Sequence, residues 1–279
     1  MKNLYPEVLV AWFLAFAVRQ ICNFQGIMEM FKYALNGFWE LLLLQMAGFQ
    51  IETINGVTWY ISAMMLSMAI LYPMLRKYTN FMKMIGAPLL SILLIGWLCH
   101  EYANLRSPFV WTGIVYKGTI RIFAELCLGV VCYQLARHLE RISLNTNGRI
   151  FIAIVEWIGY FSILIYMQTM QSSRLDYFFL TVWLLCIAIS FSGCGIDAEV
   201  YNNKIVYCLG RLSMPIYLSH QVSAVSTKRA ISLGYCVGAE IWIVYLLTAI
   251  VNCLIVIAIS ALIKKHGYKF LKFVKNYLT

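Results

Sequence analysis

The sequence has little charge for its length. Asp, Glu, Lys and Arg make up 12% of its 279 residues, whereas hydrophobic residues make up 62%. This composition excludes a soluble globular domain of this size. The apolar segments are also too long and too continuous for the alternating strands of an outer-membrane barrel. The sequence therefore predicts an all-α fold, a polytopic transmembrane helix bundle.

The sequence also lacks a paired-cysteine motif. Its nine cysteines lie almost all inside apolar segments, and none forms a C-x-x-C pair. Cysteines in this setting are typical of small buried hydrophobes. We therefore predict neither a disulfide framework nor a metal site. The start, MKNLYPE, shows no cleavage site before a long apolar segment, so we expect no signal peptide.

Acidic residues are scarce, and the net charge is +10. A basic protein can bind nucleic acid, but here the basic residues are scattered over short loops between apolar segments. That distribution is typical of membrane orientation, and we predict no nucleic-acid partner.

Eight segments are long and apolar enough to be predicted as membrane spans. A ninth, Phe38–Phe49, has an apolar core of only about twelve residues, flanked by Glu40 and interrupted by Gln45, so we predict a re-entrant segment. We find no linker or repeat, and expect one domain over 1–279. The predicted spans are Val8–Ile21, Val57–Leu75, Met84–His100, Thr119–Ala136, Ile150–Met167, Tyr177–Gly195, Ile205–Val222 and Ala239–Ile263.

The basic residues also predict the orientation. The tail after Ile263 holds five lysines, which places the C-terminus in the cytoplasm. With eight spans, thirteen basic residues lie inside and seven outside, and both termini are cytoplasmic. The tail alternates lysine with aromatic residues and is expected to lie along anionic membrane lipid.

The stretch Ile205–Val222 is the most polar of the predicted spans. A central arginine costs roughly 2.5–3.5 kcal/mol in a membrane helix, so Arg211 should face protein or water. The same stretch carries Tyr217, Ser219 and His220. Two interpretations remain open, a bundle-facing helix whose polar groups only pair, and a helix that lines a functional cavity.

The remaining polar residues of the spans sort into two layers. Arg121 and Glu125 are four residues apart, so they share a helix face, either as a self-neutralising pair or as part of a site. Trp59 and Tyr60 suit an aromatic belt or a sugar-stacking surface, and His220 is either solvated or faces a cavity. The candidate polar site near the outer ends comprises Arg121, Glu125, His220, Ser219, Tyr217, Trp59, Tyr60, Ser62 and His100. The candidate anion-binding side near the cytoplasm comprises Arg211, Arg76, Lys77 and Arg137.

Four stretches carry a resemblance to a known family. They are Leu4–Glu7 (LYPE), Thr58–Leu75 with its TWYISAMM and LYPML, Lys117–Gly129 (KGTIRIFAELCLG) and Leu209–His220 (LGRLSMPIYLSH). In order and spacing, the chain resembles the acyltransferase 3 family of bacterial integral membrane proteins, which O-acylate surface polysaccharides and related acceptors.

The resemblance implies a location in the bacterial cytoplasmic membrane, an acyl-CoA donor such as acetyl-CoA, and a glycan acceptor. It implies that the basic residues hold the CoA phosphates on the cytoplasmic side. It also implies that two further family helices, one with the catalytic base, would precede Met1. We therefore expect the chain to be N-terminally incomplete relative to the family, to require that missing N-terminal half, and to be weakly active alone. No residue of this sequence inherits the role of the base.

Two other classes of function fit the same composition. A transporter or flippase for a lipid-linked glycan also needs several spans with intramembrane charges, although we find no inverted repeat. A non-catalytic subunit of a surface-glycan assembly is the third possibility. Acyl-CoA binding to the purified protein separates an acyltransferase from a flippase, which has no reason to bind acyl-CoA.

Overall fold

The computed structural model describes residues 4–49, 53–196, 203–235, 238 and 240–278, and describes side chains as far as residue 266. Over these residues the chain is helical and contains no β-strand, which confirms the all-α prediction. It divides into two compact units. Unit 1 comprises residues 1–45, 49–59 and 207–279, and unit 2 comprises residues 46–48 and 60–206.

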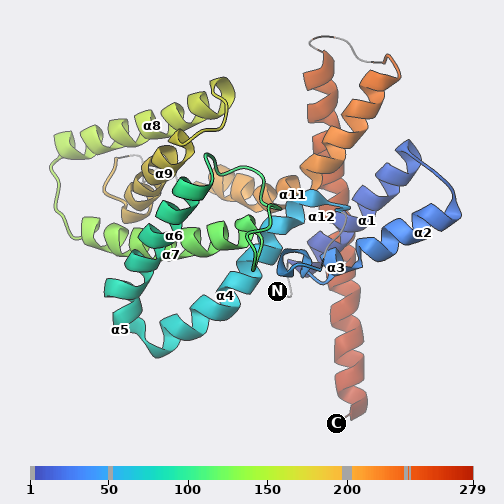
Figure 1. The fold of residues 1–279 in the computed structure, drawn as a ribbon, viewed down its shortest axis with the longest axis horizontal. Helices are drawn as coiled ribbons and strands as arrows, with labels where there is room; N and C mark the ends of the chain where they lie inside the picture. Colours follow the sequence, from blue (N-terminus) through green and yellow to red (C-terminus); the bar gives the residue numbers. More distant parts are fainter. Residues whose placement is uncertain (1–3, 50–52, 197–202, 236–237, 239, 279) are drawn as a thin grey trace. The chain divides into compact units, whose positions relative to one another are not determined.

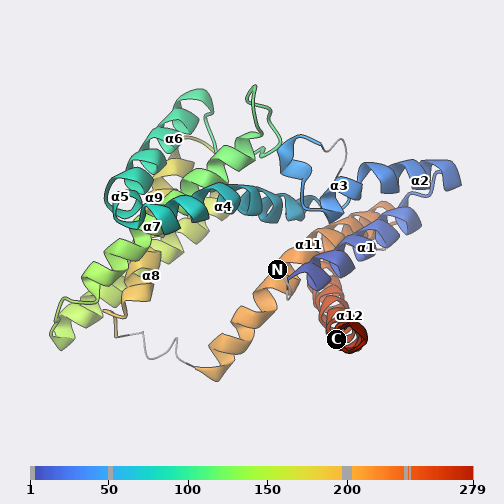
Figure 2. The ribbon, with the colours of Figure 1, turned by 90° about the horizontal axis from the view of Figure 1, so that it is seen from below.

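Unit 1 is built on α1 (Tyr5–Cys22), α11 (Lys204–Ser232) and α12 (Glu240–Leu278). The short helices α2 (Ile27–Asn36) and α3 (Phe38–Leu41) follow α1, and α2 runs back beside α1 in the opposite direction (Figures 1 and 2). Trp12 and Ala15 of α1 pack with Ile54 and with Val222 of α11 to form the core of the unit.

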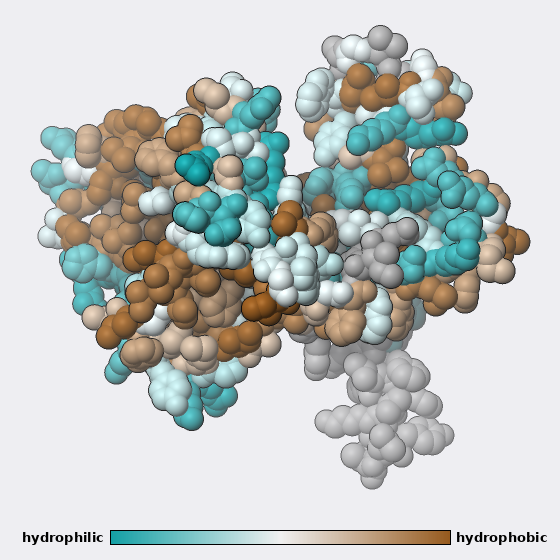
Figure 3. Space-filling model, viewed as in Figure 1, coloured by the Kyte–Doolittle hydropathy of each residue, from teal (hydrophilic) through white to brown (hydrophobic). Residues whose placement is uncertain are grey.

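Unit 2 contains α4 (Trp59–Lys77), except for Trp59, which belongs to unit 1. It also contains α5 (Thr79–Phe81), a π-helical turn (Met82–Gly86) and α6 (Ala87–Glu101). It continues with α7 (Lys117–Leu139), α8 (Thr146–Thr169) and α9 (Leu175–Ser192). Helix α7 contacts both α6 and α9, and α9 also contacts α8. Hydrophobic side chains gather on the surface of these helices (Figure 3), as expected for a lipid-facing bundle.

Among the described residues, seven helical segments are long and apolar enough to cross a membrane, and each overlaps a predicted span. The eighth predicted span, Ile205–Val222, is helical within α11 but is not among the seven. Arg211, His220 and Gln221 lower the mean hydropathy of this stretch below that of the other spans. The helix nevertheless continues through Pro215.

The stretch Phe38–Phe49 forms no spanning helix, as predicted from its length. It holds α3 and a 3₁₀ turn, Gln45–Ala47, separated by Leu43, whose φ of 56° interrupts the helix. Its two polar residues, Glu40 and Gln45, are buried, and both form hydrogen bonds within the protein.

Candidate functional site

Arg121 and Glu125 form the predicted ion pair on one face of α7. The Arg121 Nε donates to the Glu125 Oε1 at 2.6 Å, and the two side chains are 27% and 18% exposed. The Arg121 Nη1 also donates to the backbone oxygen of Leu105 at 2.8 Å. The pair is therefore neutralised, and it holds the loop between α6 and α7 as well.

Lys117, at the start of α7, is buried, with only 2% of its surface exposed. Its Nζ donates to the backbone oxygens of Asn104 and Arg106, both at 2.7 Å, and lies 4.7 Å from the centre of the Tyr102 ring. In the count of basic residues, Lys117 is one of the seven predicted to lie on the outer side of the membrane. Its spacing of four residues from Arg121 is the sequence signal that places both cations on the same helix face.

Asp176, in the first turn of α9, fixes the same loop from the other side. Its carboxylate accepts the Tyr166 hydroxyl at 2.6 Å, the backbone N–H of Leu105 at 2.9 Å and that of Ser173 at 3.3 Å. The Tyr177 hydroxyl lies 2.7 Å from the backbone oxygen of Leu98. Asp176 was not predicted from the sequence, because its contact with Leu105 joins residues 71 positions apart.

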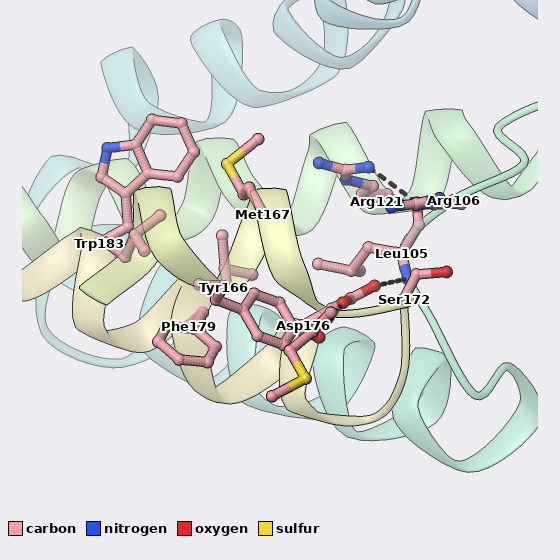
Figure 4. A pocket seen from close by; sticks show the side chains of 12 residues that line it. Leu105, Arg106, Arg121, Tyr166, Met167, Ser172, Asp176, Phe179 and Trp183 are labelled. Atoms are coloured by element: carbon pink, nitrogen blue, oxygen red, sulfur yellow. Dashed lines mark hydrogen bonds between the residues drawn. The ribbon is translucent and has the colours of Figure 1, made fainter. Parts of the chain in front are cut away.

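These residues border a cavity of about 220 Å³ within unit 2. Figure 4 shows Arg121, Arg106 and Leu105 on one side, with Tyr166, Phe179 and Trp183 on the other. The cavity thus has a polar end and an apolar end. The lining comprises Leu105, Arg106, Arg121, Ile163, Tyr166, Met167, Met170, Ser172, Asp176, Phe179, Leu180 and Trp183.

The start of α4 brings two predicted site residues toward the ion pair. The buried Ser62 hydroxyl accepts the backbone N–H of Met46 at 3.1 Å, and the Thr119 hydroxyl donates to the Met46 oxygen at 3.2 Å. Tyr60 lies within electrostatic range of Arg121 and Glu125. Unit 2 therefore collects Tyr60, Ser62, Arg121 and Glu125 at the same ends of α4 and α7.

Unit 1 contains a second polar cluster, centred on Glu40. This carboxyl group is fully buried and accepts the backbone N–H groups of Ile54 (2.8 Å) and Asn55 (2.9 Å) and the Thr58 hydroxyl (2.6 Å). Burial raises the pKa of Glu40 to about 7, against the lowering effect of these hydrogen bonds and of the Arg19 charge. Glu40 was visible in the sequence only as an interruption of an apolar segment.

The loop that Glu40 holds also binds α11. The Asn55 Nδ2 donates to the Leu218 oxygen at 2.9 Å, and the Tyr217 hydroxyl donates to the Val57 oxygen at 2.5 Å. Ser219 is buried, and its hydroxyl lies 3.4 Å from the Ile216 oxygen. Trp59 directly follows this loop, as the first residue of α4.

His220 is partly buried next to Tyr217 on α11. Its Nδ1 lies 2.6 Å from the Tyr217 backbone oxygen, and the two rings are 5.8 Å apart. Because a carbonyl oxygen can only accept, the Nδ1 of His220 is the donor in this contact. His100, by contrast, lies at the end of α6 with a side chain that is 85% exposed, and it does not line the cavity.

Three of the predicted anion-binding residues lie at the other end of unit 2. Arg76 and Lys77 end α4, and Arg137 is in the last turn of α7, where it pairs with Glu140 at 2.5 Å. The Gln134 Nε2 donates to the Lys83 backbone oxygen at 2.5 Å, which brings this part of α7 beside the turn after α4. Arg211 is exposed on α11 in unit 1.

The described residues contain no cluster of three or more His, Cys, Asp or Glu side chains that could hold a metal ion. The comparisons with curated proteins and with solved structures give no match. The family model described as "Acyltransferase domain" matches residues 1–265, a range that includes both polar clusters. The chain therefore belongs to the acyltransferase 3 family, as its motifs predicted.

Proposed function

We propose that this membrane protein transfers an acyl group, acetyl in the simplest case, from acyl-CoA to a hydroxyl group of a cell-surface polysaccharide or related glycan. The observation that carries the proposal is the family match over residues 1–265, which extends through both units. The membrane is the bacterial cytoplasmic membrane, and both termini lie in the cytoplasm.

The reaction exchanges a thioester for an ester. The acceptor hydroxyl attacks the thioester carbonyl, a C–O bond forms, the C–S bond breaks, and CoA leaves with the thiol sulfur. The proton of the hydroxyl passes to a general base and then to the leaving thiolate. The negative charge that develops on the carbonyl oxygen needs a positioned donor.

Arg121 is suited to supply that donor. A guanidinium group has five N–H donors, and Glu125 and Leu105 each accept from one of its nitrogens. Glu125 and the Leu105 carbonyl hold the guanidinium in place, so its remaining N–H groups can point at a substrate without further ordering. Ser62 and Tyr60 lie on the neighbouring helix α4.

The donor side is the end of unit 2 that carries Arg76, Lys77 and Arg137. Their side chains are exposed there, and phosphate groups are strong acceptors for arginine and lysine. CoA phosphates would bind at this end, while the thioester reaches toward Arg121 along α7.

The test uses the full chain in lipid nanodiscs, with acetyl-CoA labelled in the acetyl group and an oligosaccharide acceptor. We expect saturable acetyl-CoA binding and a weak label in the acceptor that hydroxylamine releases, as it does from an ester. Replacing Arg76 and Lys77 with glutamine should weaken donor binding, whereas the matched Arg174→Gln should not. Absence of acyl-CoA binding would contradict the proposal and favour a transporter.

A further inference from the structure

The cavity of unit 2 changes from polar to apolar along the helix axes. Arg106 and Ser172 lie in the loops at the helix ends, and Arg121 lies in the first turns of α7. Trp183 lies eight residues after Leu175, the first residue of α9, which corresponds to about 12 Å along the helix at 1.5 Å per residue. The cavity therefore extends from the depth of lipid headgroups into the depth of lipid chains.

The polar end has an excess of positive charge. The lining holds two arginines, Arg106 and Arg121, and one carboxylate, Asp176, which leaves a net charge of +1. Lys117 and Glu125 lie next to these residues but outside the lining, and their charges cancel. Glu125 is committed to Arg121, and Asp176 already accepts three hydrogen bonds. Within the described part of the chain, the exposed Arg106 side chain makes no hydrogen bond or ion pair. Its guanidinium is therefore open to an anion.

The apolar end is formed by the facing sides of α8 and α9. Ile163 and Met167 come from α8, and Phe179, Leu180 and Trp183 come from α9. Both helices are among those apolar enough to span the membrane. A hydrocarbon chain fits this surface, whereas a water-soluble anion would leave it unfilled.

We propose that this cavity binds a membrane lipid with a phosphate headgroup, with the phosphate on Arg106 and Arg121 and a hydrocarbon chain between α8 and α9. A bulk phospholipid and a lipid-linked sugar phosphate share this chemistry. The site shares Arg121 with the proposed transfer chemistry but lies apart from the proposed donor side, and its occupancy can be measured without acyl transfer.

The test is native mass spectrometry of the full chain in detergent, with four added probes. They are phosphatidylglycerol, diacylglycerol with the same chains, a polyprenyl phosphate and soluble glycerol phosphate. We expect the two phosphate lipids to bind more tightly than diacylglycerol, which lacks the phosphate, and than glycerol phosphate, which lacks the chain. The tighter of the two phosphate lipids identifies the source. Equal binding of diacylglycerol and phosphatidylglycerol would overturn the proposal.

Two substitutions locate the bound lipid. Arg106→Gln removes charge-assisted hydrogen bonds and should weaken phosphate-lipid binding about tenfold. The control is Arg174→Gln, which makes the same charge change at an exposed residue outside the cavity lining and should leave binding unchanged. Leu180→Trp fills the apolar end and should weaken both phosphate lipids while the melting temperature stays within a few degrees. Equal effects of Arg106→Gln and Arg174→Gln would show general surface attraction and refute the site.

Discussion

At the scale of single residues, Arg121 makes structural contacts and is also the proposed donor to the thioester carbonyl oxygen. It pairs with Glu125, holds Leu105 and borders the cavity. Lysine keeps the charge but lacks the planar fork of donors. We expect Arg121→Lys to fold normally while acyl transfer falls by at least a hundredfold, since loss of one oxyanion donor costs about 10²–10³ in rate. The measurement is the initial rate of ester formation, with the melting temperature as the control for folding.

The pair itself can be tested by removing both charges. Arg121→Met combined with Glu125→Leu removes a partly buried ion pair without leaving either charge unpaired, and such replacements are often neutral for stability. We expect the double variant to keep its expression and melting temperature. Glu125→Leu alone should lower stability by about 1–3 kcal/mol, because it leaves the guanidinium short of an acceptor. Equal losses in the single and double variants would show that the pair is not a unit.

Glu40 predicts a specific dependence of stability on pH. Its pKa is about 7 in the folded protein, compared with the usual 4.5. Between these values the folded state holds the proton and the unfolded state does not, so the free energy of unfolding falls as the pH rises, by about 3 kcal/mol in all. Glu40→Gln should remove this slope. Unfolding in mild detergent at several pH values from about 5 to 8 measures how the free energy of unfolding of each protein changes with pH. The two proteins would show the same pH dependence if Glu40 titrated normally.

At the scale of helices, continuous apolar runs were the reliable signal. All seven of the long apolar helices coincide with predicted spans, because lipid requires an uninterrupted apolar segment. Helix α2 was not predicted. It is only ten residues long, and the charged residues Glu29 and Lys32 interrupt its apolar residues, so it has no long apolar run.

The site was predictable only where its partners are close in sequence. The spacing of four residues was enough to predict the Arg121–Glu125 pair. The contacts of Asp176 with Leu105 and of Glu40 with Ile54 join residues 71 and 14 positions apart. Such contacts depend on how loops pack, and no local pattern encodes them.

Helices α8 and α9 pack closely at Gly159. A Cβ added at Gly159 would overlap the Cys186 sulfur, whereas a Cβ at Gly129 of α7 would meet open space. Gly159→Ala should therefore destabilise the protein by about 1–3 kcal/mol through overpacking. Gly129→Ala, the matched control, should be neutral or slightly stabilising. Thermal unfolding of the two variants provides the comparison, and equal stabilities would argue against this helix contact.

At the scale of the whole molecule, one contact bears on the membrane orientation. Lys264 of α12 pairs with Glu7 of α1 at 2.8 Å, so the start of α1 and the charged end of the α12 span lie at the same end of unit 1. That both termini lie on the cytoplasmic side remains a prediction, which topology reporters can test. Reporters fused after Thr279 and after Arg141 should both be cytoplasmic, and a reporter near Arg174 should be external. Reporters at residues 30 and 54 should both be external. If these two reporters lay on opposite sides of the membrane, the re-entrant segment would be refuted.

The central claim is that the acyl group passes from a donor at the basic end of the bundle to a hydroxyl group at the other end. Transfer by the full chain in sealed vesicles, with acetyl-CoA on one side and the glycan on the other, tests this claim most directly. We predict label in the glycan when acetyl-CoA is on the side of Thr279, and none when the two are exchanged. Transfer that requires donor and acceptor on the same side of the membrane would contradict it.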